Sequence, residues 1–209
     1  MTTRLASIIS YVLHPLMMST YLFTILVIIA PYYILPIGYA TTGSVVLVSL
    51  IWITTFIIPV LSLFILKMTG SISSLQLDKK EERITPIMYT TLMYAVTTYL
   101  FASKVELGEP IFIFLGISTL LLGIGAVITI FWKISLHGIG IGGLVGCLMG
   151  LNQQSVLDNF YLVLPLLLLT SALVLSARLK LNAHSPKQVY IGFVLGIFVS
   201  FVSFIIYLV

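Results

Sequence analysis

The segment 176–192 combines residue types that bind phosphate and react with it. Arg178 precedes His184 by six positions, and Gln188 follows His184 by four. A guanidinium group binds phosphate oxygens through paired, charge-assisted hydrogen bonds. An imidazole titrates near neutral pH and acts as a nucleophile, an acid or a base. The segment therefore predicts a basic, histidine-containing anion site.

Two other polar segments of the chain carry similar residue types. Segment 133–138 contains a Lys, a Ser and a His, and segment 76–86 contains a short charged run. Each of these segments borders a long apolar stretch, so we expect their side chains at the edge of a membrane. The residues concerned are Lys133, Ser135 and His137 in the first segment, and Lys79, Lys80 and Arg83 in the second.

The composition of the chain is that of a membrane protein. Of 209 residues, 60% are hydrophobic and 8% are charged, with a mean hydropathy of +1.20, whereas soluble chains carry about a quarter charged residues. Apolar helices of about 17 to 25 residues cross a bilayer. The candidate spans are 6–30, 43–66, 86–101, 110–132, 137–150, 157–175 and 188–209. Because the third and fifth are short, we predict a single all-α integral membrane domain, 1–209, with six to seven transmembrane helices.

The order of these spans predicts where the polar segments lie. One helical hairpin separates Arg83 from His137, and another separates His137 from His184. Two crossings return the chain to the same side of the bilayer each time. We therefore expect Arg83, His137, Arg178 and His184 to form an anion site at one membrane surface, where the N-termini of the fifth and seventh spans add positive potential.

The positive charges favour the same side of the membrane. In the seven-span arrangement every Lys and Arg except Lys104 falls on the side of the N-terminus. Cytoplasmic segments are enriched in Lys and Arg, so we expect an inner-membrane protein of bacterial type with this side in the cytoplasm. An anion site needs cations on whichever side it faces, which is a second reason for the same distribution. Basic residues scattered over membrane-edge loops do not suit nucleic acid.

The segment around His184 resembles the third signature of the type-2 phosphatidic acid phosphatase superfamily, S-R-x5-H-x3-D-x3-G. Arg178, His184 and Gly192 match it. Two positions depart from it, because Ala177 separates the Ser from the Arg and Gln188 takes the place of the Asp.

The other two polar segments are similar to the remaining signatures of that superfamily. Ser135 and His137 match the Ser and His of P-S-G-H. Arg83 matches the Arg of K-x6-R-P, with Lys79 or Lys80 as a substitute for its Lys. The resemblance covers roughly residues 76–196, most of the chain.

The resemblance implies a lipid phosphatase that works without a metal or another cofactor. His184 would attack phosphorus to form a phosphohistidine, and His137 would protonate the leaving group and later activate water. The phosphoryl oxygens would be bound by Arg178, Arg83, Lys79, Lys80, Lys133 and Ser135. The substrate would be a lipid phosphate or diphosphate held in the bilayer: phosphatidate, phosphatidylglycerophosphate, a polyprenyl diphosphate or a glycolipid of the lipid A type.

Gln188 leaves two interpretations open. Its carbonyl can orient the ring of His184 in place of the family's Asp, but it carries no charge. Gln188 also completes a capping box, S-x-x-Q, with Ser185 and with Pro186 at the first helical position. A catalytically inactive relative that binds anionic lipid, or that serves as a subunit of a membrane complex, is therefore the alternative to an enzyme.

Three features outside these segments lead to weaker predictions. His14 precedes Pro15 within the first span, where a histidine invites a functional interpretation, but we favour a structural one, in which it bonds a backbone carbonyl that the proline leaves unpaired. Within 138–150 the glycines at 138, 142, 146 and 150 recur every four residues, which favours close packing of two helices in lipid. Cys147 stands alone, and the three His residues are not spaced as metal ligands.

Overall fold

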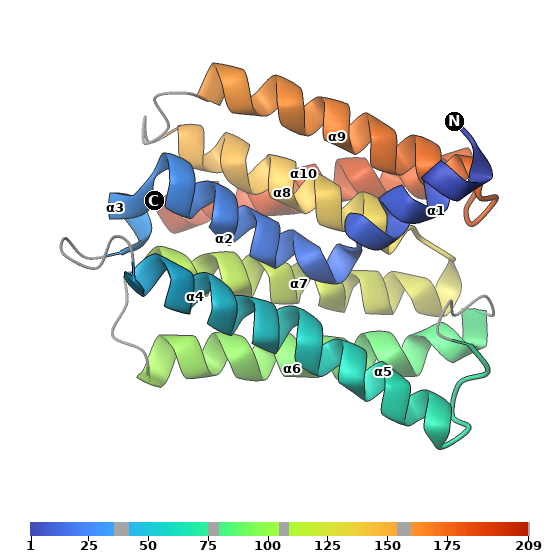
Figure 1. Ribbon diagram of the computed structural model, residues 1–209. Coiled ribbons are helices and arrows are strands. Elements are labelled where there is room, and N and C mark those ends of the chain that lie inside the picture. Colours follow the sequence, from blue (N-terminus) through green and yellow to red (C-terminus); the bar gives the residue numbers. More distant parts are fainter. Residues whose placement is uncertain (36–41, 75–79, 105–108, 154–159, 209) are drawn as a thin grey trace.

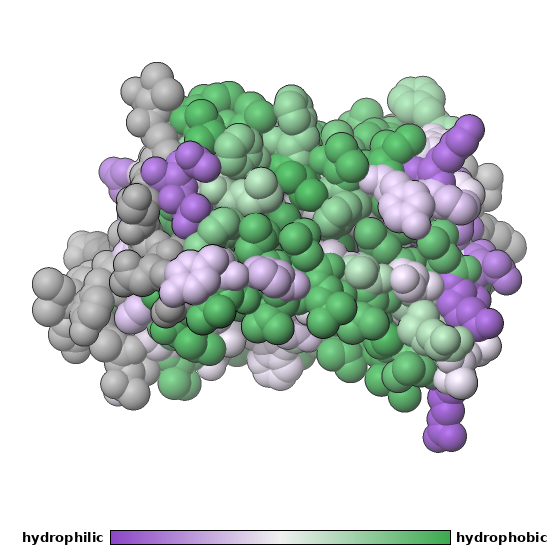
Figure 2. Space-filling view, turned by 90° about the horizontal axis from the view of Figure 1, so that it is seen from above, coloured by the Kyte–Doolittle hydropathy of each residue, from purple (hydrophilic) through white to green (hydrophobic). Residues whose placement is uncertain are grey.

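Helices running roughly along one common direction make up the described structure (Figure 1). The computed structural model describes the chain apart from residues 36–41, 75–79, 105–108, 154–159 and 209. Apolar side chains cover the middle of the face seen in Figure 2, and hydrophilic ones gather towards its ends. By length and composition, five helical stretches can cross a membrane: Thr3–Ile29, Thr42–Met68, Glu109–Phe131, Phe160–Lys180 and Pro186–Tyr207. The predicted class, a helical membrane protein, is confirmed.

The third and fifth predicted spans correspond to helices that are less apolar or shorter than the other predicted spans. Helix α6 (Lys80–Lys104) begins six residues before Pro86, so its first turns are charged and the proline lies inside it. Helix α8 (Leu136–Asn152) is apolar but has only 17 residues. Neither belongs to the five long apolar stretches of the described chain.

The first predicted span is broken rather than continuous. It consists of α1 (Thr3–Val12), a short 3-10 helix η1 (Pro15–Met17) and α2 (Met18–Ile29), which is followed by α3 (Pro31–Ile34). The break falls at His14, because Pro15 has no N–H for an α-helical bond and disfavours helical backbone in the residue before it. A polar side chain therefore stands at an interruption within the first span.

The second predicted span changes its helical pitch at a proline. Helices α4 (Thr42–Trp52) and α5 (Ile58–Met68) flank a π-helical turn, η2 (Ile53–Ile57). Pro59 offers no N–H to the carbonyl of Thr55, four residues earlier, and the hydroxyl of buried Tyr94 bonds that carbonyl at 3.0 Å. The same hydroxyl lies 3.2 Å from the carbonyl of Leu16 in η1. Tyr94 of α6 thus joins the irregular points of both spans.

Helix α8 lies in the centre of the bundle, in parallel contact with α10 (Pro186–Leu208) and bordered by α7 (Glu109–Phe131) and α9 (Phe160–Lys180). A Cβ atom on Gly138 would lie 2.7 Å from the carbonyl oxygen of Val189, and one on Gly142 would meet that of Phe193. Gly146 faces the backbone of α10 in the same way. The glycine stripe therefore permits backbone contact between the two helices, as its spacing predicted.

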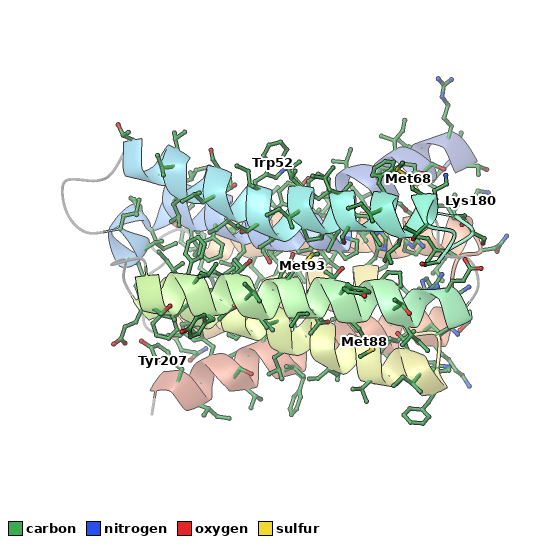
Figure 3. All side chains as sticks on the ribbon, turned by 90° about the horizontal axis from the view of Figure 1, so that it is seen from below. Trp52, Met68, Met88, Met93, Lys180 and Tyr207 are labelled. Atoms are coloured by element: carbon green, nitrogen blue, oxygen red, sulfur yellow. The ribbon has the colours of Figure 1, made fainter. Side chains whose placement is uncertain are left out.

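The helix directions bring most of the basic residues to one end of the molecule, which we call the basic end. The start of α1, the end of α5, the start of α6, the α7–α8 connection and the α9–α10 connection all lie there (Figure 1). Figure 3 shows Met68 and Lys180 towards this end and Tyr207 towards the opposite one. The basic residues with described side chains at this end are Arg4, Lys67, Arg83, Lys133, Arg178, Lys180 and Lys187.

Candidate functional site

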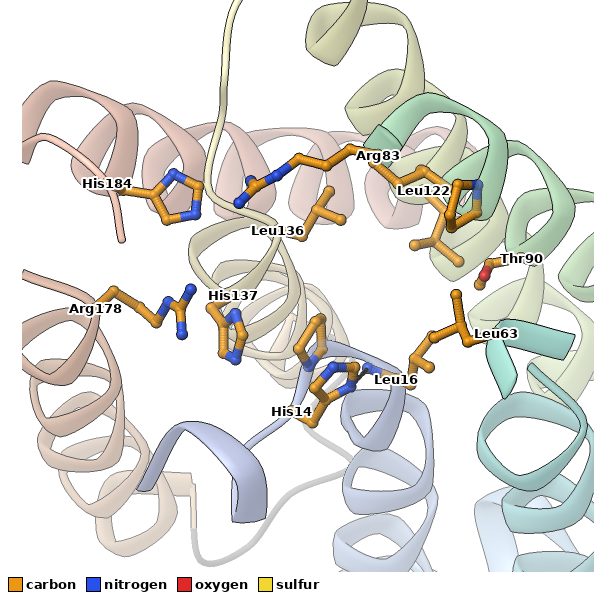
Figure 4. A pocket seen from close by; sticks show the side chains of 13 residues that line it. His14, Leu16, Leu63, Arg83, Thr90, Leu122, Leu136, His137, Arg178 and His184 are labelled. Atoms are coloured by element: carbon orange, nitrogen blue, oxygen red, sulfur yellow. Dashed lines mark hydrogen bonds between the residues drawn. The ribbon is translucent and has the colours of Figure 1, made fainter. Parts of the chain in front are cut away.

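A cavity of about 130 Å³ lies among the helices near the basic end, and both basic and apolar side chains line it (Figure 4). Its basic part contains two arginines and three histidines: Arg83, Arg178, His14, His137 and His184. Four of these five were predicted from the order of the spans to share one membrane surface, and the structure brings all four to one cavity. The chemical roles assigned to them stay predictions.

The turn between α9 and α10 explains why Arg178 and His184 face the same cavity. Helix α9 ends in a Schellman motif, in which the N–H of Ala183 bonds the carbonyl of Arg178 at 3.2 Å and the N–H of Asn182 bonds that of Leu179 at 3.0 Å. Asn182 has φ of 50°, the left-handed conformation that this motif requires. The turn ends the helix two residues after Arg178 and brings the chain back at His184.

His184 is oriented by a backbone carbonyl. Its side chain is 8% exposed, and Nδ1 lies 3.2 Å from the carbonyl oxygen of Lys133 in the α7–α8 connection. Because a carbonyl oxygen only accepts hydrogen bonds, Nδ1 carries the hydrogen. In the neutral ring the lone pair is then on Nε2, the nitrogen available for attack on an electrophile.

The surroundings of His184 favour that neutral ring. Burial is the largest cause, and the nearby charges of Arg83 and Arg178 act in the same direction. Together they lower the pKa of His184 to about 4, although the bond to the Lys133 carbonyl acts against them. The imidazole is therefore unprotonated at neutral pH, the state that a nucleophile requires.

His137 is held by the first helix. It lies in the first turn of α8, is 9% exposed, and its Nε2 lies 3.1 Å from the carbonyl oxygen of Ser10 in α1. By the same reasoning Nε2 carries a hydrogen, and Nδ1 is the nitrogen that can gain or lose a proton. Its charged or titratable neighbours include Arg178, His14 and His184.

Gln188 and Ser135 serve as helix caps. The N–H of Ser185 donates to Oε1 of Gln188 at 3.0 Å, and the N–H of Gln188 lies 3.4 Å from Oγ of Ser185, so the capping box exists. Oγ of buried Ser135 accepts the N–H of Gly138 at 3.2 Å at the start of α8. Neither capping side chain is among those that line the cavity.

The lysines predicted to bind phosphate are not among the described side chains that line the cavity. Lys133 is half-buried and supplies the carbonyl that holds His184, and its charge also acts on that ring. Lys79 lies outside the described residues, as does the side chain of Lys80. Among the side chains that the structure describes, no three His, Cys, Asp or Glu come close enough to hold a metal ion.

His14 also lines the cavity, although the sequence favoured a purely structural role for it. Its Nδ1 accepts the N–H of Leu16 at 3.3 Å and so caps η1, instead of donating to a carbonyl as predicted. Its ring meets that of His137 edge-on, with centroids 5.6 Å apart. The available signal was its residue type, because a histidine within an apolar span is costly unless it faces a polar interior.

The fold and the cavity define a helical membrane protein with a basic, histidine-lined cavity near one end of its bundle. No protein-family model, curated protein or solved structure matches the chain. The function must therefore be inferred from the residues themselves.

Proposed function

We propose that this protein is a membrane lipid phosphatase that hydrolyses a lipid phosphate or diphosphate through a phosphohistidine. The supporting observation is that Arg83, His137, Arg178 and His184, which come from three separate segments of the chain, line one cavity. Two guanidinium groups offset the charge of a phosphate dianion. Binding alone needs no imidazole, so the two histidines favour a reaction rather than simple anion binding.

In the first step, Nε2 of His184 attacks phosphorus while Arg83 and Arg178 bind the phosphoryl oxygens. A P–N bond forms and the P–O bond to the lipid breaks. His137, protonated on Nδ1 beside the dianionic substrate, gives that proton to the leaving oxygen. The arginines stabilise the charge on the phosphoryl oxygens in the transition state.

In the second step, a water molecule attacks the phosphohistidine. His137 takes a proton from this water on Nδ1, the P–N bond breaks, and inorganic phosphate leaves. His184 regains its lone pair on Nε2. Because His137 ends the cycle with the proton that it lost, the enzyme is regenerated without a cofactor.

The apolar part of the cavity suits the lipid side of such a substrate. Leu16, Leu63 and Leu122 line it on the side away from His184 (Figure 4). A substrate whose phosphate lies against Arg178 and His184 would extend its apolar portion towards these side chains. We also propose that α6 and α8 cross the bilayer, which gives seven passes, and that the basic end forms the cytoplasmic surface.

The proposal is tested by inorganic phosphate release from purified protein in detergent. The substrates would be phosphatidate, phosphatidylglycerophosphate, a polyprenyl diphosphate and a lipid A-type glycolipid. We expect release from at least one, and a loss of at least about a thousandfold in His184→Ala. The matched control is Lys187→Ala, which removes an exposed charge three residues away.

A second readout detects the intermediate directly. Substrate labelled in its phosphate should transfer acid-labile, base-stable label to the wild-type protein but not to His184→Ala. If no substrate releases phosphate and no label is transferred, while a reference lipid phosphatase works in the same detergent, the enzyme proposal fails.

The capping box favours a second candidate, a non-catalytic protein that binds anionic lipid or joins a membrane complex. Because Oε1 of Gln188 bonds the N–H of Ser185, the residue at the family's Asp position is engaged in holding the helix start. The same cavity would then retain a phosphate head group without cleaving it. Saturable lipid phosphate binding by an inactive wild type, weakened in Arg178→Gln, would support this candidate.

A further inference from the structure

His14 gives the cavity a third imidazole that the proposed reaction does not use. It stands at the break between α1 and η1, an interruption within an apolar span. It lines the same cavity as His137 and His184. The inference below rests on the function proposed above and extends it to the leaving group.

The backbone fixes the protonation of His14. A backbone N–H can only donate, so the nitrogen that accepts it from Leu16, Nδ1, carries no hydrogen. The neutral ring therefore has its hydrogen on Nε2. A second proton could be added only at Nδ1, where it would displace the Leu16 bond, so His14 is a fixed hydrogen-bond donor and unsuited to acid–base catalysis.

The position of His14 indicates which part of a substrate it would meet. Figure 4 shows His137 between Arg178 and His14, and the apolar lining around Leu16 beyond them. The ring contact between His14 and His137, at 5.6 Å between centroids, places His14 beside the proposed acid. Along the cavity, the nucleophile and guanidinium groups come first, then the acid with His14, then the apolar side.

We propose that His14 donates a hydrogen bond from Nε2 to an oxygen of the leaving group, next to the bond that breaks. That oxygen is either the lipid alcohol oxygen of a monophosphate or an oxygen of the inner phosphate of a diphosphate. His14 is then a substrate-binding residue that recognises the lipid side of the substrate, and it makes no contact with the phosphoryl group that is transferred.

Two substitutions separate this role from the capping of η1. His14→Asn keeps a side-chain oxygen for the Leu16 N–H, as expected of an N-cap, but its amide is too short to reach the place of Nε2. His14→Gln keeps an N–H at about the reach of Nε2 but alters the cap. We expect kcat/KM on lipid substrates to fall about 10- to 100-fold in His14→Asn, the effect of losing a hydrogen bond to a charged group, and to recover largely in His14→Gln.

Which oxygen His14 binds is determined by comparing a prenyl monophosphate with the diphosphate of the same prenyl alcohol. If His14 binds a non-bridging oxygen of the inner phosphate, only the diphosphate loses turnover in His14→Asn. If it binds the oxygen of the bond that breaks, which is the alcohol oxygen of the monophosphate and the bridging oxygen of the diphosphate, both substrates lose turnover. Inhibition by inorganic phosphate, which has no leaving group, should be unchanged in His14→Asn and weakened in Arg178→Gln. The pH–rate profile should keep its shape.

Three outcomes would overturn the inference while the wild type remains active. In the first, His14→Asn is fully active whereas His14→Gln is less active and less stable. His14 would then serve only to cap η1. The second is that inorganic phosphate inhibits His14→Asn as weakly as it inhibits Arg178→Gln, which would place the His14 ring against the transferred phosphoryl group. The third is a changed pH profile, which would make it an acid or base. An inactive wild type would instead contradict the proposed function itself.

Discussion

Backbone groups, and not carboxylates, orient the three histidines of the cavity. His184 is held by the carbonyl of Lys133, His137 by that of Ser10, and His14 by the N–H of Leu16. A backbone carbonyl fixes a ring and its tautomer, as an acidic partner would, but it carries no full negative charge to stabilise an imidazolium. Without a substrate, these partners therefore suit the neutral forms of the three rings.

The protonation of His184 provides a prediction at the residue scale. Its pKa, lowered to about 4 mainly by burial and then by Arg83 and Arg178, should appear as a midpoint near pH 4 in an NMR titration of isotope-labelled histidine in detergent. Arg83→Gln removes one positive neighbour. The imidazolium becomes less unfavourable, so the midpoint should rise towards the ordinary 6.5, though only in part because burial remains.

The control for this titration is Arg4→Gln, which removes a charge from the same end but not one of those acting on His184. It should leave the midpoint unchanged. A wild-type midpoint already near 6.5, or one that does not respond to Arg83→Gln, would contradict the assigned environment.

The sequence predicted the members of the cavity that stand at helix ends, but it did not place His14, inside a span, beside them. Arg83, His137, Arg178 and His184 follow from counting membrane crossings, because each lies next to an apolar stretch. His14 lies inside an apolar stretch instead of beside one, and only the packing of the broken first span beside α8 brings it to His137. The capping role of Gln188 was one of two interpretations that its spacing allowed.

At the scale of the elements, the sequence predicted the effect of the glycines of α8 but not that of the prolines in the first two spans. A stripe of glycines indicates close helix packing from the sequence alone, and in the structure the glycines of α8 do lie against the backbone of α10. The break at Pro15 and the change of pitch before Pro59 were not predicted, because an apolar window looks the same whether a proline kinks a helix or interrupts it. At Pro59, the Thr55 carbonyl that loses its helical N–H is bonded by the hydroxyl of Tyr94, a partner that only the folded structure shows.

The contact between α8 and α10 predicts a position-dependent response to alanine. In Gly142→Ala the new Cβ would meet the carbonyl oxygen of Phe193, a backbone atom that cannot rotate away. We expect a loss of about 1–3 kcal/mol in the free energy of unfolding, the usual cost of overpacking, visible as a lower midpoint of thermal unfolding in detergent.

Gly123→Ala in α7 is the matched control. Its Cβ would lie 3.7 Å from a methyl group of Thr91, an ordinary contact, and alanine favours a helix over glycine by about 1 kcal/mol. This variant should be as stable as the wild type or more so. Equal stability of the two variants would mean that the helices lie further apart than described.

At the scale of the whole molecule, the proposed orientation can be tested by chemical labelling. Lys180 is exposed at the basic end, and Ser103 is exposed near the end of α6, at the opposite end. In a Cys147→Ala background, Ser103→Cys should react with a membrane-impermeant maleimide in intact spheroplasts. Lys180→Cys should react only after the membrane is opened, because the positive-inside rule places the basic end in the cytoplasm.

The reverse labelling pattern would mean that the basic residues follow the needs of the cavity and not the direction of insertion. Labelling of both positions in intact spheroplasts would contradict seven passes, since these two positions would then share one side. The buried native Cys147 is removed so that only the introduced thiols report.

The backbone contact between α8 and α10 has a mechanical consequence for a protein that works in lipid. Hydrogen bonds from His184 to the Lys133 carbonyl and from the Ser135 N–H to the Gln188 carbonyl join the starts of these two helices. We therefore expect the two imidazoles of the proposed reaction to move together. Arg83 belongs to α6, which can tilt separately when the bilayer thickens or thins. A change in membrane thickness would then alter the affinity for substrate before it altered the distance between His137 and His184.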